Sequence, residues 1–190
     1  MNNTWPLAAG FVRKWEGGYV DDPADPGGVT KYGVSLRWLR AIGLDVDHDG
    51  DVDADDVRAL TPELALDLFR QRFWNGLYLD EVPGLPAVAI FDAAVNCGMV
   101  RSVRLAQQCC NFYPGLHLIE DGTFGPVTRA RIESIVLDNP QAERAFAARL
   151  LSAREQFYRN LVQRKPELAK FLNGWINRVN ALRVALGVSE

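Results

Sequence analysis

The sequence has little cysteine, no long apolar run and no low-complexity segment. No apolar stretch approaches the roughly 18 residues that a membrane-spanning helix needs, so we expect no stable membrane insertion. Three cysteines, two of them adjacent, make a poor disulfide framework and suggest synthesis in a reducing compartment. They show no CxxC motif and no Cys/His metal spacing, so small buried hydrophobic residues are the better interpretation.

Charge is distributed unevenly along the chain. Residues 1–100 carry 8 Lys and Arg against 16 Asp and Glu, whereas residues 101–190 carry 13 against 8. Seven of the acids fall within residues 45–56, and without them the first half is close to neutral, so the asymmetry consists of one local acid cluster and a mildly basic C-terminal half. A basic surface favours anionic polymers, but solvated helix faces are the preferred interpretation and we expect no nucleic-acid partner. Five arginines recur at a spacing of five, which spreads them around a helix: Arg144, Arg149, Arg154, Arg159 and Arg164.

Helical periodicity dominates the chain. Apolar positions predict a first helix that ends near Trp15. Ser35 is a good N-cap for a short helix that Gly43 ends, and Thr61 is a good N-cap for the next. An apolar segment follows that predicts a buried central helix, broken at Gly98. Few segments alternate like strands, so the sequence predicts a mainly α protein with a small irregular or β lobe.

The stretch DVDHDGDVDADD at residues 45–56 fits the EF-hand calcium-loop pattern. Gly50 falls where the loop turns sharply, and Val52 takes the apolar position. The stretch resembles the calcium loops of dockerin modules, in which an aspartate at the last position is normal. We therefore expect a structural Ca²⁺ rather than a solvated acidic turn, and the absence of a second loop argues against a calcium sensor. The ligand positions are Asp45, Asp47, Asp49, Asp51 through its carbonyl, Asp53 and Asp56.

Glu16 stands alone at the end of the first apolar helix, before a loop rich in Gly, Pro and Asp. A carboxyl group on a rigid element can serve as a general acid where desolvation disfavours its charged form. Glycosidic bond cleavage uses such an acid and a second carboxylate, which acts as base or nucleophile according to its separation from the first. The candidates for the second carboxylate are Asp21, Asp22 and Asp25.

The stretch EGGYVDDPADPGGVTKYGVS at residues 16–35 resembles the N-terminal signature of glycoside hydrolase family 108. This family contains phage endolysins and bacterial N-acetylmuramidases. The resemblance continues in FDAAVNCG at residues 91–98, in EDGTFGPVT at 120–128 and in FLNGWINRVN at 171–180. Residues 120–128 are similar to a peptidoglycan-binding element, although they could equally organise the start of a helix. The calcium-type loop looks like an insertion between the first two conserved blocks.

The resemblance implies a lysozyme-like, mainly helical fold and cleavage of the bond from N-acetylmuramic acid to N-acetylglucosamine. It implies Glu16 as the catalytic acid. By analogy with phage-type lysozymes, Asp25 and Thr30 position the attacking water, with Asp22 as the alternative to Asp25. Candidate substrate-binding residues are those that flank the motif or line the expected cleft: Tyr19, Asp22, Tyr32 and Asn96. Burial is the alternative for Asn96 and Asp92, and core packing for Trp38 and Trp74.

The resemblance also implies a domain organisation and a place of action. Residues 1–95 are expected to form the catalytic region, and residues 96–190 a helical peptidoglycan-binding region packed on it in one compact monomer. The N-terminus lacks the pattern of a secretory signal. We therefore expect synthesis in the bacterial cytoplasm and action on the wall in the periplasm after release. The alternatives to a muramidase are a lytic transglycosylase and a non-catalytic wall-binding or secretion-helper protein.

Overall fold

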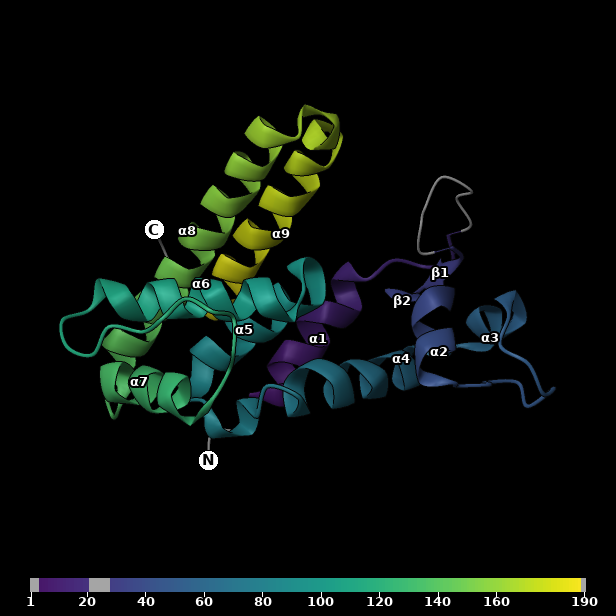
Figure 1. Ribbon diagram of the computed structural model, residues 1–190, viewed down its shortest axis with the longest axis horizontal. Helices are drawn as coiled ribbons and strands as arrows, with labels where there is room; N and C mark the ends of the chain where they lie inside the picture. The colour runs from purple at the N-terminus through teal and green to yellow at the C-terminus, as the bar shows by residue number, and fades with distance from the viewer. Residues whose placement is uncertain (1–3, 21–27, 189–190) are drawn as a thin grey trace. The chain divides into compact units, whose positions relative to one another are not determined.

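The computed structural model describes residues 4–20 and 28–188, which are mainly helical with one two-stranded sheet (Figure 1). The predicted mainly α class with a small β lobe is therefore confirmed. Backbone packing divides the chain into two compact units, Val12–Gln71 on one hand and Met1–Phe11 with Arg72–Glu190 on the other. The predicted functional regions, residues 1–95 and 96–190, follow a different criterion and stay a prediction.

In its described residues, the unit Val12–Gln71 contains the end of one helix, a hairpin and three short helices. Strands β1 (Thr30–Lys31) and β2 (Val34–Ser35) pair antiparallel, with Thr30 opposite Ser35. The bridge between Val20 and Thr30 adds one more antiparallel pair. The helices, in chain order, are α1 (Trp5–Trp15), α2 (Leu36–Ile42), α3 (Ala54–Ala59) and α4 (Pro62–Phe69).

Helices α2 and α4 begin, and α2 ends, where the sequence predicts. The Ser35 side chain accepts a hydrogen bond from the Trp38 N–H at the start of α2, and Gly43 ends that helix in the left-handed conformation. The Thr61 hydroxyl accepts from the Leu64 N–H at the start of α4. These side chains satisfy backbone groups that a helix end leaves unpaired, so capping residues set the element boundaries.

The larger unit is built around one buried helix. Helix α5 (Gly84–Cys97) is apolar on most of its surface and packs against α6 (Met99–Phe112) and α8 (Pro140–Arg164). Gly98, with φ 85°, separates α5 from α6, as the sequence predicts. Figure 1 shows α8 and α9 (Ala169–Leu186) side by side. The remaining elements are η1 (Arg70–Asn75), which begins before the unit boundary, η2 (Leu79–Glu81), α7 (Pro126–Val136) and η3 (Pro166–Leu168).

An aromatic cluster packs beside α5. The rings of Trp5, Trp74 and Phe91 meet edge to face, with centroids 5.3–5.6 Å apart. Trp74 is buried and its indole N–H donates to Asp80 Oδ1 at 2.8 Å, so this residue belongs to the core. In the part of the chain that the structure describes, no helix is both long and apolar enough to cross a membrane.

Candidate active site

Glu16 directly follows the last residue of α1. Its N–H donates to the Val12 carbonyl at 2.8 Å, so the helical hydrogen-bond pattern continues to the residue. The half-buried side chain lines a small pocket together with Arg13, Tyr32 and Phe69. The pocket volume, about 10 Å³, suffices for at most one water molecule. A sugar bound at Glu16 would therefore lie outside this pocket, against its opening.

The hairpin turn packs directly against the Glu16 carboxyl group. Tyr32 and Gly33, with φ of 51° and 75°, form the two central residues of a turn between β1 and β2. Two positive φ values are those of a type I′ turn, for which glycine is the least strained residue. A Cβ atom at Gly33 would collide with Glu16 Oε2 and would lie 2.9 Å from Phe69 Cζ. Only glycine lets the turn approach the carboxyl group this closely.

Thr30 and Tyr19 lie on the chain segments beside this turn. The Thr30 N–H and carbonyl exchange hydrogen bonds of 2.9 and 2.8 Å with Val20, and its hydroxyl donates to the Gly28 carbonyl at 3.2 Å. Tyr19 is 40% exposed, with the Arg58 guanidinium 5.7 Å from its ring centre. The remaining predicted acids lie in the sequence between Val20 and Thr30, which pair with each other. The predicted Asp22 and Asp25 lie outside the described residues.

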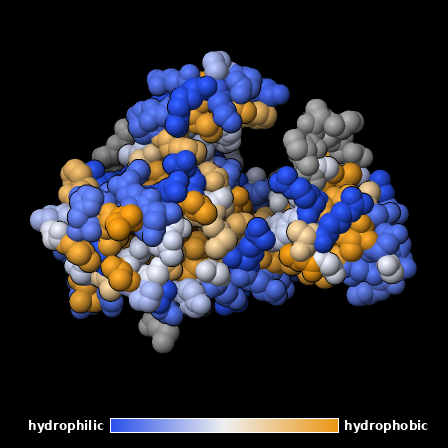
Figure 2. All heavy atoms as spheres, in the orientation of Figure 1, coloured by the Kyte–Doolittle hydropathy of each residue, from blue (hydrophilic) through white to orange (hydrophobic). Residues whose placement is uncertain are grey.

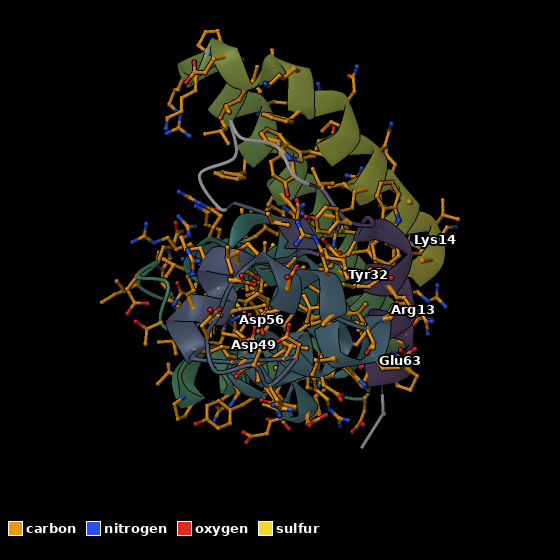
Figure 3. All side chains as sticks on the ribbon, turned by 90° about the vertical axis from the view of Figure 1, so that its right-hand side faces the viewer. Arg13, Lys14, Tyr32, Asp49, Asp56 and Glu63 are labelled. Atoms are coloured by element: carbon orange, nitrogen blue, oxygen red, sulfur yellow. The ribbon has the colours of Figure 1, made fainter. Side chains whose placement is uncertain are left out.

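Glu16 and Tyr32 are thus the two predicted site residues that the structure brings to one pocket. Tyr32 donates its N–H to the Gly17 carbonyl at 3.0 Å, which ties the hairpin to the residues after Glu16. Arg13, on the last turns of α1, forms an exposed ion pair with Glu63 at 3.4 Å. Figure 3 shows Tyr32, Arg13 and Glu63 on one side of this unit, apart from the acid-loop residues Asp49 and Asp56.

The acid loop is folded so that its carboxylates converge in two groups. The carboxylate oxygens of Asp45, Asp47 and Asp49 lie within 4.8 Å of one another, and so do those of Asp51, Asp53 and Asp56. Gly50, with φ 105°, makes the turn between the groups. Backbone N–H groups orient the acids at both ends of the loop. His48 and Gly50 donate to Asp45, while Val46 and Asp53 donate to Asp56.

The carboxylates of the acid loop repel one another, and this repulsion changes the pKa values of some of them. The charge of Asp49 and desolvation by the surrounding loop raise the pKa of the exposed Asp51, and desolvation together with the charge of Asp49 raises that of the exposed Asp47. Burial acts in the same direction on Asp56, but the N–H donors from Val46 and Asp53 outweigh it and lower the pKa. The loop therefore keeps several negative charges close together at neutral pH, and a divalent cation would relieve the repulsion.

Asn96 lies in the larger unit, within a buried polar network. Its side-chain oxygen accepts from Arg154 Nη2 at 3.1 Å and from the Tyr158 hydroxyl. Burial raises the pKa of Tyr158 to about 12, so the hydroxyl keeps its proton and remains a donor. Arg154 also binds Asp92, which in addition binds Arg178 at 2.7 Å. The contacts of Asn96 are those of a structural hydrogen bond, and its predicted contact with substrate stays a prediction.

The sequence interpretation of the arginines as solvated is wrong for one of them. Arg154 has an exposed fraction of 0% and lies at the centre of the network just described. A spacing of five residues identifies the helix positions correctly, but it does not reveal that one position faces inward. The signal that could have found it is the position of Arg154 in the apolar register of α8, one turn after Leu150 and one before Tyr158.

The Gln107 side chain holds residues 121–123, which lie just before α7 in the sequence. The buried amide donates to Asp121 Oδ1 at 2.9 Å and to the Thr123 carbonyl at 3.2 Å, and accepts from the Gly122 N–H at 3.0 Å. Thr128 is buried at the start of α7. Of the two interpretations of this motif, these contacts favour the organisation of the helix start.

Fold and site together define a class. A mainly helical protein with a small hairpin, and a carboxyl group at the end of its first helix packed against that hairpin, is lysozyme-like in architecture. A solved structure of Brucella abortus SagA is similar to this chain. It shows a TM-score of 0.75 and 29% sequence identity, and the match covers 100% of this chain and 98% of that one.

Comparison with protein families identifies both halves of the chain. Residues 9–98 match the family described as Glycosyl hydrolase 108, and residues 101–180 match the family described as Predicted Peptidoglycan domain. The chain therefore carries a glycosyl hydrolase 108 region followed by a peptidoglycan domain, which confirms the resemblance seen in the sequence. It is a glycoside hydrolase whose partner is peptidoglycan. A search of curated proteins found no match.

Proposed function

We propose that the protein is a muramidase that hydrolyses the β-1,4 bond from N-acetylmuramic acid to N-acetylglucosamine in peptidoglycan, with Glu16 as general acid. The single observation that carries the proposal is the position of Glu16. It directly follows α1 within the matched hydrolase region, and its carboxyl group packs against a turn that glycine alone permits. A carboxyl group fixed in this way can meet a glycosidic oxygen in one defined orientation.

The reaction needs a proton donor and an activated water. Glu16 donates its proton to the glycosidic oxygen as the bond from that oxygen to the anomeric carbon breaks. A water molecule adds to the anomeric carbon and gives up a proton to a second carboxylate, which we assign to Asp25, with Thr30 helping to hold the water. The pairing of Thr30 with Val20 supports this assignment, because Asp25 lies in the sequence between these two residues, in the same unit as Glu16.

The test is the release of reducing ends from purified peptidoglycan. Glu16→Gln is expected to lower the rate by about 10²–10⁴-fold, because the amide cannot donate the proton. Glu133→Gln, an exposed change of the same kind on α7, is the matched control and should leave the rate unchanged. In the same assay Asp25→Asn should lose more activity than Asp22→Asn. Full activity of Glu16→Gln would refute the proposal and favour a non-catalytic wall-binding protein.

We further propose that the acid loop binds a structural Ca²⁺. Both groups of carboxylates offer hard oxygen ligands, and the N–H donors to Asp45 and Asp56 hold the two ends of the loop in place. Because the loop joins α2 to α3 and lies apart from the pocket of Glu16 (Figure 3), the ion would stabilise the fold and would not take part in the chemistry.

Thermal unfolding tests the calcium proposal. Ca²⁺ at a hundredfold excess over its dissociation constant adds about 2.7 kcal/mol, which raises the Tm of a chain of this size by about 5–10 °C. Asp49→Asn should reduce this shift, while Asp67→Asn, an exposed acid on α4, should not. An identical Tm in millimolar Ca²⁺ and in excess chelator would refute the proposal that the acid loop binds a structural Ca²⁺.

A further inference from the structure

A second cavity, of about 740 Å³, lies in the larger unit. Residues of η1, of the junction between α5 and α6, and of α8 line it. Three of them are arginines, Arg72, Arg101 and Arg104, and none of the lining residues that the structure describes is acidic. We refer to this site as the arginine cavity. Among the described residues, the buried arginines Arg154, Arg178 and Arg183 each bind a carboxylate directly, whereas the lining of this cavity supplies none.

The arginines of α6 are held in place without an acid. The Arg101 guanidinium stacks over the Phe157 ring, 4.5 Å from its centre, which orients the group and leaves its N–H edge available. Arg104 Nη2 donates to the Asp121 carbonyl at 3.4 Å, while its buried Nε has no hydrogen-bond partner within residues 4–20 and 28–188. Over the same residues, neither arginine forms an ion pair.

The two arginines act on the same region of the cavity. They are three residues apart on α6 and therefore share one helix face. Gly98, Met99 and Val100 at the start of α6 line the cavity too, and Gly98, the N-cap residue, has no side chain with which to cap the helix. The positive end of the helix dipole thus adds to the two guanidinium charges. The cavity is therefore suited to an anionic group that can accept paired N–H donors, as a carboxylate does.

The apolar residues of the cavity lining indicate what kind of anionic ligand would fit. Val95, Met99 and Val100 place apolar surface beside the arginines. A neutral sugar would offer the Arg101 and Arg104 guanidinium groups no charged acceptor, and a phosphate polymer would leave the apolar surface uncovered. A short peptide with free carboxylates and small apolar side chains uses both. We propose that the arginine cavity binds carboxylate groups of the peptides that peptidoglycan carries, an inference that rests on the proposed function and names a recognition site for its substrate.

Calorimetric titration of the full chain tests the inference. The protein carries Glu16→Gln so that the ligand is not cleaved, and the ligand is the disaccharide–tetrapeptide unit of peptidoglycan. Arg101→Gln and Arg104→Gln should each weaken binding by about tenfold, as expected for the loss of one charge-assisted contact. Arg164→Gln is the matched control. This exposed arginine lies at the end of α8, where Figure 2 shows a hydrophilic surface, and it should not change the affinity.

The ligand is varied as well as the protein. The same unit with its carboxylates amidated should bind the parent protein about tenfold more weakly than the free-acid ligand does. Each of the two cavity variants should bind the amidated and the free-acid ligands with equal affinity. Equal affinity for the free and amidated ligands would overturn the inference, and so would tighter binding of a glycerol phosphate oligomer. Arg101→Lys keeps the positive charge but lacks the planar guanidinium group that binds a carboxylate through two N–H donors. Its affinity for the ligand tests the same contact if Arg101→Gln does not fold. Binding is measured without turnover, so the result is independent of whether the glycan is cleaved.

Discussion

At the scale of single residues, the candidate site depends on a contact between a carboxyl group and a glycine. Gly33 has a positive φ and leaves no room for a Cβ atom beside Glu16 and Phe69. The side chain of Glu16 is therefore positioned by the hairpin as well as by α1. This is a steric constraint on one rotamer, and a substitution at Gly33 should displace the carboxyl group before it unfolds the hairpin.

Gly33→Ala should lower both stability and activity. The strained backbone costs about 1–3 kcal/mol, and the added methyl group pushes Glu16 away from its position, so the rate should fall further than the loss of folded protein explains. Gly43→Ala is the matched control, because φ there is also positive, at 63°, but no atom lies within 4 Å of the added Cβ. Circular dichroism gives the stability, and the reducing-end assay gives the rate. Equal rates for the two variants would show that Gly33 does not position Glu16.

The sequence predicted Glu16 and Tyr32 as site residues, but not the contact of Glu16 with Gly33. A lone acid at the end of an apolar helix, within a family motif, is visible in the chain. The contact with Gly33 is not, because it joins residues 17 positions apart and depends on the turn geometry. Arg154 was misplaced for a related reason. Charged residues are almost never fully buried unless paired, and its partner Asp92 lies 62 residues away.

At the scale of elements, a buried ionic network connects three helices. Asp92 on α5 binds Arg154 on α8 at its Oδ2 and Arg178 on α9 at its Oδ1. Burial alone would raise the pKa of Asp92, but the charges of Arg154 and Arg178 prevail and hold it below the ordinary value. Removing one member of a buried pair leaves the others uncompensated, which makes such networks costly to break.

Asp92 should make the protein sensitive to acid. Its pKa is lower in the folded than in the unfolded state, so its contribution to stability is full above about pH 4 and is lost as pH falls through the folded value. Asp92→Asn should destabilise the protein by about 3–5 kcal/mol at neutral pH. Urea unfolding at a series of pH values should then show a shallower acid decline for this variant.

Asp67→Asn supplies the comparison, since Asp67 is exposed on α4. It should keep both the stability and the acid decline of the parent protein. If the parent and Asp92→Asn lose stability in parallel between neutral pH and about pH 3, the network does not carry the acid sensitivity described here.

The boundaries of elements were predictable where a side chain or a glycine creates them. Ser35, Thr61 and Gly98 mark helix ends in the sequence and do so in the structure. The sequence did not predict which helices pack together. Helices α5, α6, α8 and α9 are all amphipathic or apolar, and periodicity alone does not pair them. The network around Asp92 shows which faces meet.

At the scale of the whole molecule, the chain combines a hydrolase region and a peptidoglycan domain over nearly its full length. The structure shows where part of the positive charge of residues 101–190 lies. Part of that charge neutralises Asp92 and part lies in the arginine cavity. The acidic excess of residues 1–100 resides largely in the loop at 45–56, which we assign to calcium. Each departure from an even charge distribution thus corresponds to one proposed binding site or one structural network.

The central claim is proton donation by Glu16 followed by attack of water. Mass spectrometry of peptidoglycan fragments released in heavy-oxygen water tests both parts directly. The account predicts fragments that end in N-acetylmuramic acid with one heavy oxygen at the reducing end, formed by the parent protein and not by Glu16→Gln. Fragments with unlabelled anhydro ends would instead identify a transglycosylase, and labelled fragments from Glu16→Gln would contradict the assignment of the acid.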